Sequence, residues 1–213
     1  MKISWLGHSA FKLEESTGTT LISDPYSPKL GLKLPQMNAD VISVSCENCF
    51  NSYTADIEGN PTIIRRPGTY EMEGIHIFGF SESQLNKSNT KNVIYKYRLD
   101  GVDVCHMGNI SSECTTLLVE TLAPIDVLLI PVGGHDVIDA DLAKEYIEKL
   151  MPSVVIPMKY RDKEANYTLN KLHDFLELFD EKDIIYSDTK TVEFDRYKVD
   201  SEETKVLILE KNI

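Results

Sequence analysis

The sequence contains no apolar run that approaches the roughly 20 residues a helix needs to cross a membrane. The longest run, 127–132, includes Pro131 and fits a buried strand better than a membrane segment. The first residues also lack the long apolar segment of a secretory signal. We therefore expect a cytoplasmic protein without a membrane partner.

Basic residues are scarce relative to acidic ones. The chain has 22 Lys and Arg against 34 Asp and Glu, which gives a net charge of -12. Such a surface repels the phosphate backbone of DNA and RNA. The composition therefore argues against nucleic acid as a partner.

Cysteine is also scarce, with Cys46, Cys49, Cys105 and Cys114 the only four. Without an export signal, we expect reduced thiols. The spacing Cys46-x-x-Cys49 is compatible with half of a zinc site, with a redox dithiol or with two unremarkable loop cysteines. Cys105 and Cys114 lack the spacing of a second zinc-binding pair, so the spacing alone does not decide between these readings.

The overall composition is that of a globular domain, with 42% hydrophobic and 26% charged residues. The 213 residues contain no internal repeat, low-complexity stretch or long linker. We therefore expect one domain that spans residues 1–213.

Short β-type runs dominate the first half, with Gly68, Gly74 and the pair Asp100-Gly101 as turns between them. The polar segment 81–91 is expected to be mobile. The strands expected in this half are 2–6, 10–13, 19–23, 41–44, 62–64, 75–80, 93–99 and 102–106.

In the second half, strands alternate with helices. Apolar residues at helical spacing predict helices over 114–122, 139–150 and 168–179. Apolar runs predict strands at 126–131, 154–158, 184–186 and 206–209. The combined order predicts an α/β or α+β fold in which helices cover sheets.

Several segments, in matching order, resemble metallo-β-lactamase-fold proteins, in the small metal-dependent hydrolase branch related to sugar-lactone lactonases. This resemblance implies a four-layer αββα sandwich with the active site at one edge, between the two sheets. The matching segments are 5–11, 22–26, 39–45, 67–71, 105–108, 127–134 and 155–158.

In that family, His and Asp side chains hold one or two metal ions, usually zinc, which generate hydroxide near neutral pH. The signature His-x-His-x-Asp-His corresponds here to Cys-Glu-Asn-Cys-Phe-Asn. The resemblance also places an amide where the bridging aspartate stands and a lysine where the last histidine stands. The positions that have lost the family's residue type are Cys46, Asn48, Phe50, Asn51, Asn109 and Lys159.

Lys159 would put a cation where the metal ions sit, and a cation opposes metal binding strongly in a site of low dielectric constant. One hypothesis is that Lys159 replaces the metal and pairs with Asp24. His8, in the turn of the first hairpin, is a candidate general base, with a structural hydrogen-bonding role as the alternative.

Two functions remain open, and the sequence leaves undecided whether the chain is an enzyme. The first is a catalytically inactive hydrolase homologue that binds no metal and acts as a binding module for a small molecule or a protein. The second is a divergent hydrolase, either metal-dependent and lactonase-like or metal-independent, with a site rebuilt around Cys46, Asp24 and His8. A homo-oligomer is compatible with either.

Overall fold

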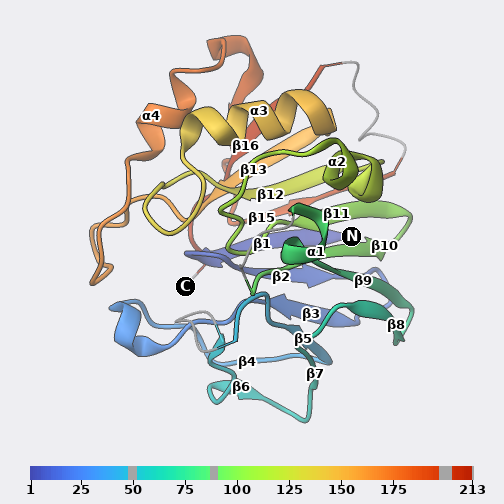
Figure 1. The fold of residues 1–213 in the computed structure, drawn as a ribbon. Helices are drawn as coiled ribbons and strands as arrows, with labels where there is room; N and C mark the ends of the chain where they lie inside the picture. The colour runs from blue at the N-terminus through green and yellow to red at the C-terminus, as the bar shows by residue number, and fades with distance from the viewer. Residues whose placement is uncertain (48–51, 87–90, 197–202, 213) are drawn as a thin grey trace.

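The computed structural model describes residues 1–47, 52–86, 91–196 and 203–212. Two mixed sheets pack face to face, and most of the α-helices lie on the outer face of one of them (Figure 1). Among the described residues, no helix is both long and apolar enough to cross a membrane.

The first sheet has six strands and is built around the N-terminal hairpin. β1 and β2 are antiparallel, with a register shift between Trp5 and Gly7, and β3, β5 and β7 then run parallel to one another. Its strand order is β15 (Thr191–Glu193), β1 (Lys2–Gly7), β2 (Ala10–Glu14), β3 (Thr20–Ser23), β5 (Val41–Ser43) and β7 (Thr62–Ile64).

The second sheet has eight strands, and its centre is parallel. β11, β12 and β13 run in one direction, and β12 is buried along its whole length, as expected of a parallel strand covered on both faces. Its strand order is β14 (Ile184–Tyr186), β16 (Lys205–Ile208), β13 (Val154–Met158), β12 (Val127–Pro131), β11 (Val102–His106), β10 (Val93–Leu99), β9 (Ile75–Ser81) and β8 (Gly68–Met72).

Successive side chains along a strand point to opposite faces of the sheet, so one strand contributes to the core on each side of it. In β10, Tyr95 and Tyr97 enter the core between the sheets, whereas Ile94 joins the core under the helices. That second core packs against α1 (Glu82–Asn86), α2 (Thr116–Leu122), α3 (Ala140–Leu150) and α4 (Leu172–Leu176). Thr115 and Asp139 cap α2 and α3 through their side chains, which fixes where both helices begin.

The outer face of the six-stranded sheet has a different cover. Among the residues that the structure describes, the core on this side contains Leu6, Ile22 and Tyr26 but no residue of an α-helix. The elements here are the 3-10 helix η1 (Pro28–Leu30) and the small sheet of β4 (Met37–Asn38) and β6 (Ile57–Glu58) (Figure 1). A second 3-10 helix, η3 (Glu181–Asp183), precedes β14.

The predicted fold class and most predicted strands are confirmed, and the differences have physical causes. Gly68 begins β8 instead of marking a turn, and α1 occupies the start of the segment expected to be mobile. The helix predicted over 168–179 is only α4, because Asn170 bonds to Arg161 and Gly133 through its backbone. These tertiary bonds hold residues before α4 in a non-helical conformation.

Candidate functional site

The candidate site lies where parallel strands of both sheets end. The carboxyl ends of β3, β5, β11, β12 and β13 lead into the segments that carry Asp24, Ser45, Asn109, Asp136 and Lys159. Because parallel strands end at the same edge of a sheet, side chains far apart in the sequence meet here.

Asp24 is buried directly after β3, and its carboxylate accepts two hydrogen bonds from one residue. The Ser45 backbone N–H donates to Oδ1 at 2.7 Å, and the Ser45 hydroxyl donates to Oδ2 at 2.6 Å. The backbone N–H of Asp24 donates in turn to the Ser43 carbonyl. These bonds tie the end of β3 to the end of β5.

His106, at the end of β11, is completely buried and bonded at both ring nitrogens. The backbone N–H of Gly108 donates to Nδ1 at 3.1 Å, so Nε2 carries the proton and donates to the Ser9 carbonyl at 2.8 Å. Burial lowers the pKa of His106, against the opposing effect of the Asp24 carboxylate. The His106 ring is therefore uncharged, and its bond to Ser9 connects the eight-stranded sheet to the six-stranded sheet.

Asn92 positions the turn that follows His106. Its side-chain amide donates to the Met107 carbonyl at 3.0 Å, and its oxygen accepts from the Asn109 backbone N–H at 2.8 Å. A Cβ atom at Gly108 would lie 2.4 Å from that oxygen and 2.5 Å from Cβ of Ser45. Only glycine fits at this position.

Lys159 follows β13, and its side chain is buried in the cleft with 3% of the residue exposed. Its Nζ donates a hydrogen bond to Oδ1 of Asn109. Burial lowers the pKa of Lys159 to about 8, although the carboxylates of Asp136 and Asp24 oppose this shift. The amine therefore remains mostly protonated at neutral pH.

The backbone of Lys159 holds the neighbouring hairpin turn. Its N–H donates to the His8 carbonyl at 3.1 Å, and the Trp5 indole donates to the same oxygen at 3.2 Å. The Tyr167 hydroxyl contacts Nδ1 of the His8 ring. Burial, followed by the charge of Lys159, lowers the pKa of His8, so this imidazole is neutral.

The segment after β12 approaches Lys159 closely. A Cβ atom at Gly133 would lie 2.0 Å from the Lys159 carbonyl oxygen, so any side chain there would displace the main chain. Asp136, three residues on, is exposed and acts on Lys159 through space.

Several residues at this edge have a left-handed backbone. The φ angle is 52° at His8, 47° at Asp24, 50° at Lys159 and 65° at His135. Residues other than glycine rarely adopt this conformation, and such strain concentrates at functional sites.

The structure brings Asp24, His8, Asn109 and Lys159 together at one edge, but the hypothesis that Lys159 pairs with Asp24 needs correction. The hydrogen-bond partner of the Lys159 amine is Asn109, and Asp24 influences it through space. Asn92 and Tyr167 were not predicted to lie at the site, because neither belongs to a motif and both reach the site only through the folding of distant segments.

The cysteine prediction needs correction in one respect. Cys46 is disulfide-bonded, whereas Cys105 and Cys114 are free and buried. Cys49 and the predicted positions Asn48, Phe50 and Asn51 lie outside the described residues. Within the described part of the chain, no group of three or more His, Cys, Asp and Glu side chains is arranged to hold a metal ion.

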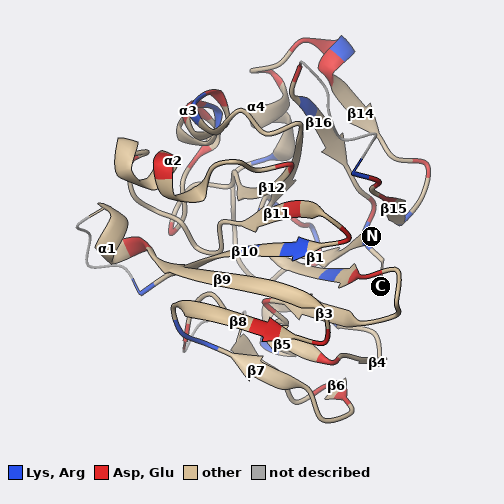
Figure 2. Cartoon of the chain, turned by 90° about the vertical axis from the view of Figure 1, so that its right-hand side faces the viewer, with Lys and Arg blue, Asp and Glu red and all other residues tan. Residues whose placement is uncertain are grey.

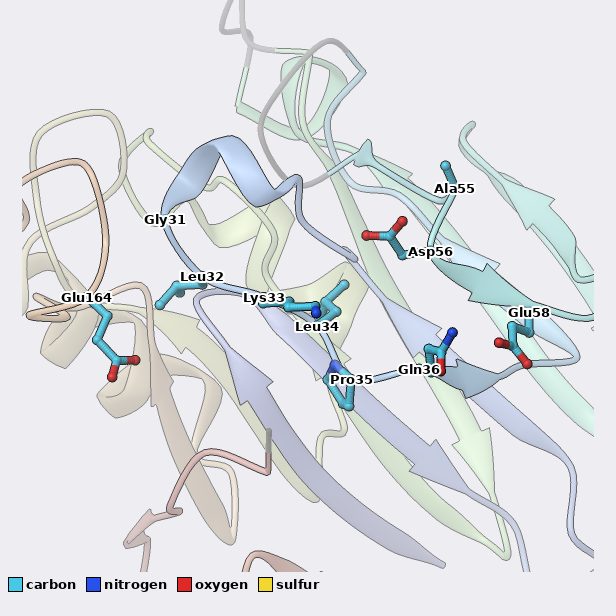
Figure 3. Close-up of a pocket in the computed structure, with 10 residues that line it drawn as sticks. All are labelled: Gly31, Leu32, Lys33, Leu34, Pro35, Gln36, Ala55, Asp56, Glu58 and Glu164. Atoms are coloured by element: carbon cyan, nitrogen blue, oxygen red, sulfur yellow. The ribbon is translucent and has the colours of Figure 1, made fainter.

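A separate cavity of about 920 Å³ opens in the layer outside the six-stranded sheet. Leu32, Leu34 and Pro35 lie along it, with the carboxylates of Asp56, Glu58 and Glu164 around them (Figure 3). It contains none of the residues of the candidate site described above.

Comparisons with known proteins agree with this fold. Residues 2–159 match the family model described as a beta-lactamase superfamily domain. A crystal structure from Thermotoga maritima, assigned to the Zn-dependent hydrolases of the metallo-β-lactamase superfamily, is 34% identical. It covers 98% of each chain with a TM-score of 0.79.

Curated relatives point to the same family. A UPF0173 metal-dependent hydrolase of Thermococcus kodakarensis is 27% identical over 75% of this chain and 84% of its own length. Its counterpart from Thermococcus onnurineus is 28% identical over the same shares.

Proposed function

Since this chain belongs to the metallo-β-lactamase superfamily, we propose that a buried ammonium has replaced its catalytic metal. The protein then acts as a binding module for a small polar molecule or a protein, and not as a metal-dependent hydrolase. One contact carries the proposal: the Lys159 amine, buried in the cleft, donates to the amide of Asn109.

The chemistry of the donor set does not fit zinc. Zinc in proteins takes imidazole, thiolate and carboxylate ligands. At the positions that correspond to the family's signature, this chain has an ammonium in Lys159, neutral amides in Asn109, Asn48 and Asn51 and a phenyl ring in Phe50. The remaining position is Cys46, whose sulfur is in a disulfide. Among the nearby groups that could ligate, the Asp24 carboxylate accepts two bonds from Ser45 and the His106 ring is bonded at both nitrogens.

Electrostatics support the same proposal. A divalent ion bound beside Asn109 would lie close to a protonated Lys159, and like charges repel strongly where water is excluded. The ammonium already provides the positive charge that the buried Asp24 carboxylate would otherwise receive from a metal. Metal binding would therefore require the amine to lose its proton or leave the cleft.

One observation favours the divergent hydrolase as a second candidate. His8 is neutral and in contact with the Tyr167 hydroxyl, so its imidazole is chemically able to accept a proton. The other two residues proposed for a rebuilt site already have partners, because Cys46 is in a disulfide and Asp24 accepts hydrogen bonds from Ser45. A reaction at this site would have to rely on His8.

Metal content tests the proposal directly. We expect zinc near zero by elemental analysis of untagged protein, both as purified and after incubation with zinc and desalting. The Thermotoga maritima relative, prepared identically, serves as the positive control. Stoichiometric zinc in the present protein would overturn the proposal.

One variant separates the loss of ligating side chains from repulsion by the Lys159 charge. Lys159→Met removes the charge and supplies no ligand, so it should still bind no zinc. If Lys159→Met takes up zinc stoichiometrically, the donor set is intact and the proposal is wrong. Hydrolysis of lactone or ester substrates would favour the second candidate function if His8→Gln abolishes the activity and the control Lys163→Met leaves it unchanged.

A further inference from the structure

The two sheets end in four edge strands, and β8 differs from the other three. β7, β14 and β15 have three residues each, whereas β8 has five. Short edge strands are one means by which proteins prevent sheets from pairing with other chains. Within the described ranges of the chain, β8 is the longest strand at an edge of these two sheets.

The hairpin geometry shows which backbone groups of β8 face outward. Glu73 and Gly74 form a two-residue turn with φ angles of 48° and 88°, so Met72 and Ile75 form a hydrogen-bonded pair. Pair types alternate along an antiparallel ladder. The N–H and C=O groups of Thr69 and Glu71 therefore point away from β9, into the free edge.

β8 carries few of the features that block edge pairing. Its five residues, Gly-Thr-Tyr-Glu-Met, include no lysine or proline, and its register with β9 is continuous. The side chains of Tyr70 and Met72 pack on the core between the sheets, while Thr69 and Glu71 are exposed. The side chains of β8 that face the core therefore do not cover its outward-facing backbone edge.

Charges along this segment are arranged asymmetrically. Arg65 and Arg66 lie in the connection before β8, whereas Glu71 and Glu73 lie in its second half and the following turn. Figure 2 shows this pattern as a blue connection from β7 and a red patch on β8. An antiparallel copy of the segment would place its acidic end beside the basic end of the first.

We propose that β8 pairs antiparallel with β8 of a second copy of this chain, with Thr69 opposite Glu71 and the two-fold axis at Tyr70. Each Thr69–Glu71 pair then exchanges both N–H···O=C bonds, and the two eight-stranded sheets become continuous. Shifting the register to place Glu71 opposite Glu71 would set like charges against each other. The interface is small and polar, so association is weak and depends on concentration.

Sedimentation velocity over a concentration series tests this surface. We expect a reversible monomer–dimer equilibrium for the full chain. Thr69→Glu, which sets a second carboxylate opposite Glu71 of the other copy, should raise the dissociation constant about tenfold or more, equivalent to about 1.4 kcal/mol. Thr62→Glu is the matched control, because Thr62 is exposed on the edge strand β7 of the other sheet.

A monomer at every concentration would overturn the proposal, as would an equal effect of Thr69→Glu and Thr62→Glu. Circular dichroism of both variants should match the unmodified protein, because both side chains are exposed.

Disulfide trapping tests the register independently. Under mild oxidation, a mixture of Thr69→Cys and Glu71→Cys proteins should form a cross-linked heterodimer, since these residues face each other in the proposed pairing. Neither variant alone should cross-link efficiently. Efficient cross-linking of Thr69→Cys with itself would show that the proposed register is wrong.

Discussion

The amine of Lys159 donates to Oδ1 of Asn109, although 50 residues separate the two along the chain. Lys159 follows β13, and Asn109 follows β11, so the contact spans the end of the intervening strand β12. A lysine and an asparagine thus join the ends of two strands of the eight-stranded sheet. This arrangement leads to predictions about charge, packing and titration.

Replacement of Lys159 should change how stability depends on pH. Because the folded-state pKa is about 8 and the usual value is 10.5, the unfolded chain binds more protons between these limits. The free energy of unfolding contributed by this group therefore rises by about 3 kcal/mol as pH increases through that window. Urea denaturation at several pH values should show this rise in the native protein relative to Lys159→Met.

Lys163→Met is the matched control for that experiment. Lys163 is exposed in the nearby loop, so its removal should leave the pH profile unchanged. Parallel profiles for the native protein and Lys159→Met would contradict a buried amine.

The His8 imidazole should report the charge of Lys159. Burial is the main reason that the pKa of His8 is lowered, and the Lys159 ammonium adds to it. Removing the ammonium in Lys159→Met should therefore raise the pKa of His8, toward but below its ordinary value. NMR titration of the imidazole resonances measures this shift, and a pKa that does not move would mean that the two groups do not interact.

Acid should destabilise the protein through His106. Its pKa is lowered in the folded state, so the unfolded chain binds the extra proton first as pH falls below about 6.5. As the pH falls from neutral to below about 6.5, the free energy of unfolding of the native protein should therefore decrease relative to that of His106→Gln. Denaturation curves at two pH values measure this change, and a relative increase on acidification would contradict a neutral His106.

Gly133→Ala tests the close approach of the segment after β12 to Lys159. The added Cβ would lie 2.0 Å from a backbone oxygen, so the main chain must move, at a cost of about 2–4 kcal/mol. Gly18→Ala is the comparison, because no atom lies within 4 Å of its new Cβ and only its φ of 102° opposes the change. Chemical denaturation should rank Gly133→Ala as clearly the more destabilising.

Local pattern predicted most of the sheets but not the details of the cleft. The strands at 93–99 and 102–106 follow from apolar runs separated by Asp100-Gly101, and the structure has them at the same positions. β8 escaped prediction because its glycine suggested a turn, and only Tyr70 and Met72 pack on the core. Its strand conformation depends on pairing with β9.

The bonds within the candidate site did not follow from the sequence. The order of the family-like segments led us to expect Asp24, Asn109 and Lys159 at one edge, and their role as site residues stays a prediction. The choice of Asn109 as the lysine's partner depends on Asn92, which bonds to the Asn109 backbone and orients the turn. No local signal in the sequence connects residue 92 to residue 159.

The left-handed backbone at His8, Asp24 and Lys159 has a consequence for protein engineering. These three positions present their side chains from conformations fixed by the surrounding sheets and by the bond from Lys159 to the His8 carbonyl. A designer who wishes to graft a metal centre into this scaffold could therefore keep the main chain and exchange side chains alone. Several exchanges would have to be made together, because removing the ammonium without adding donors leaves an empty polar recess.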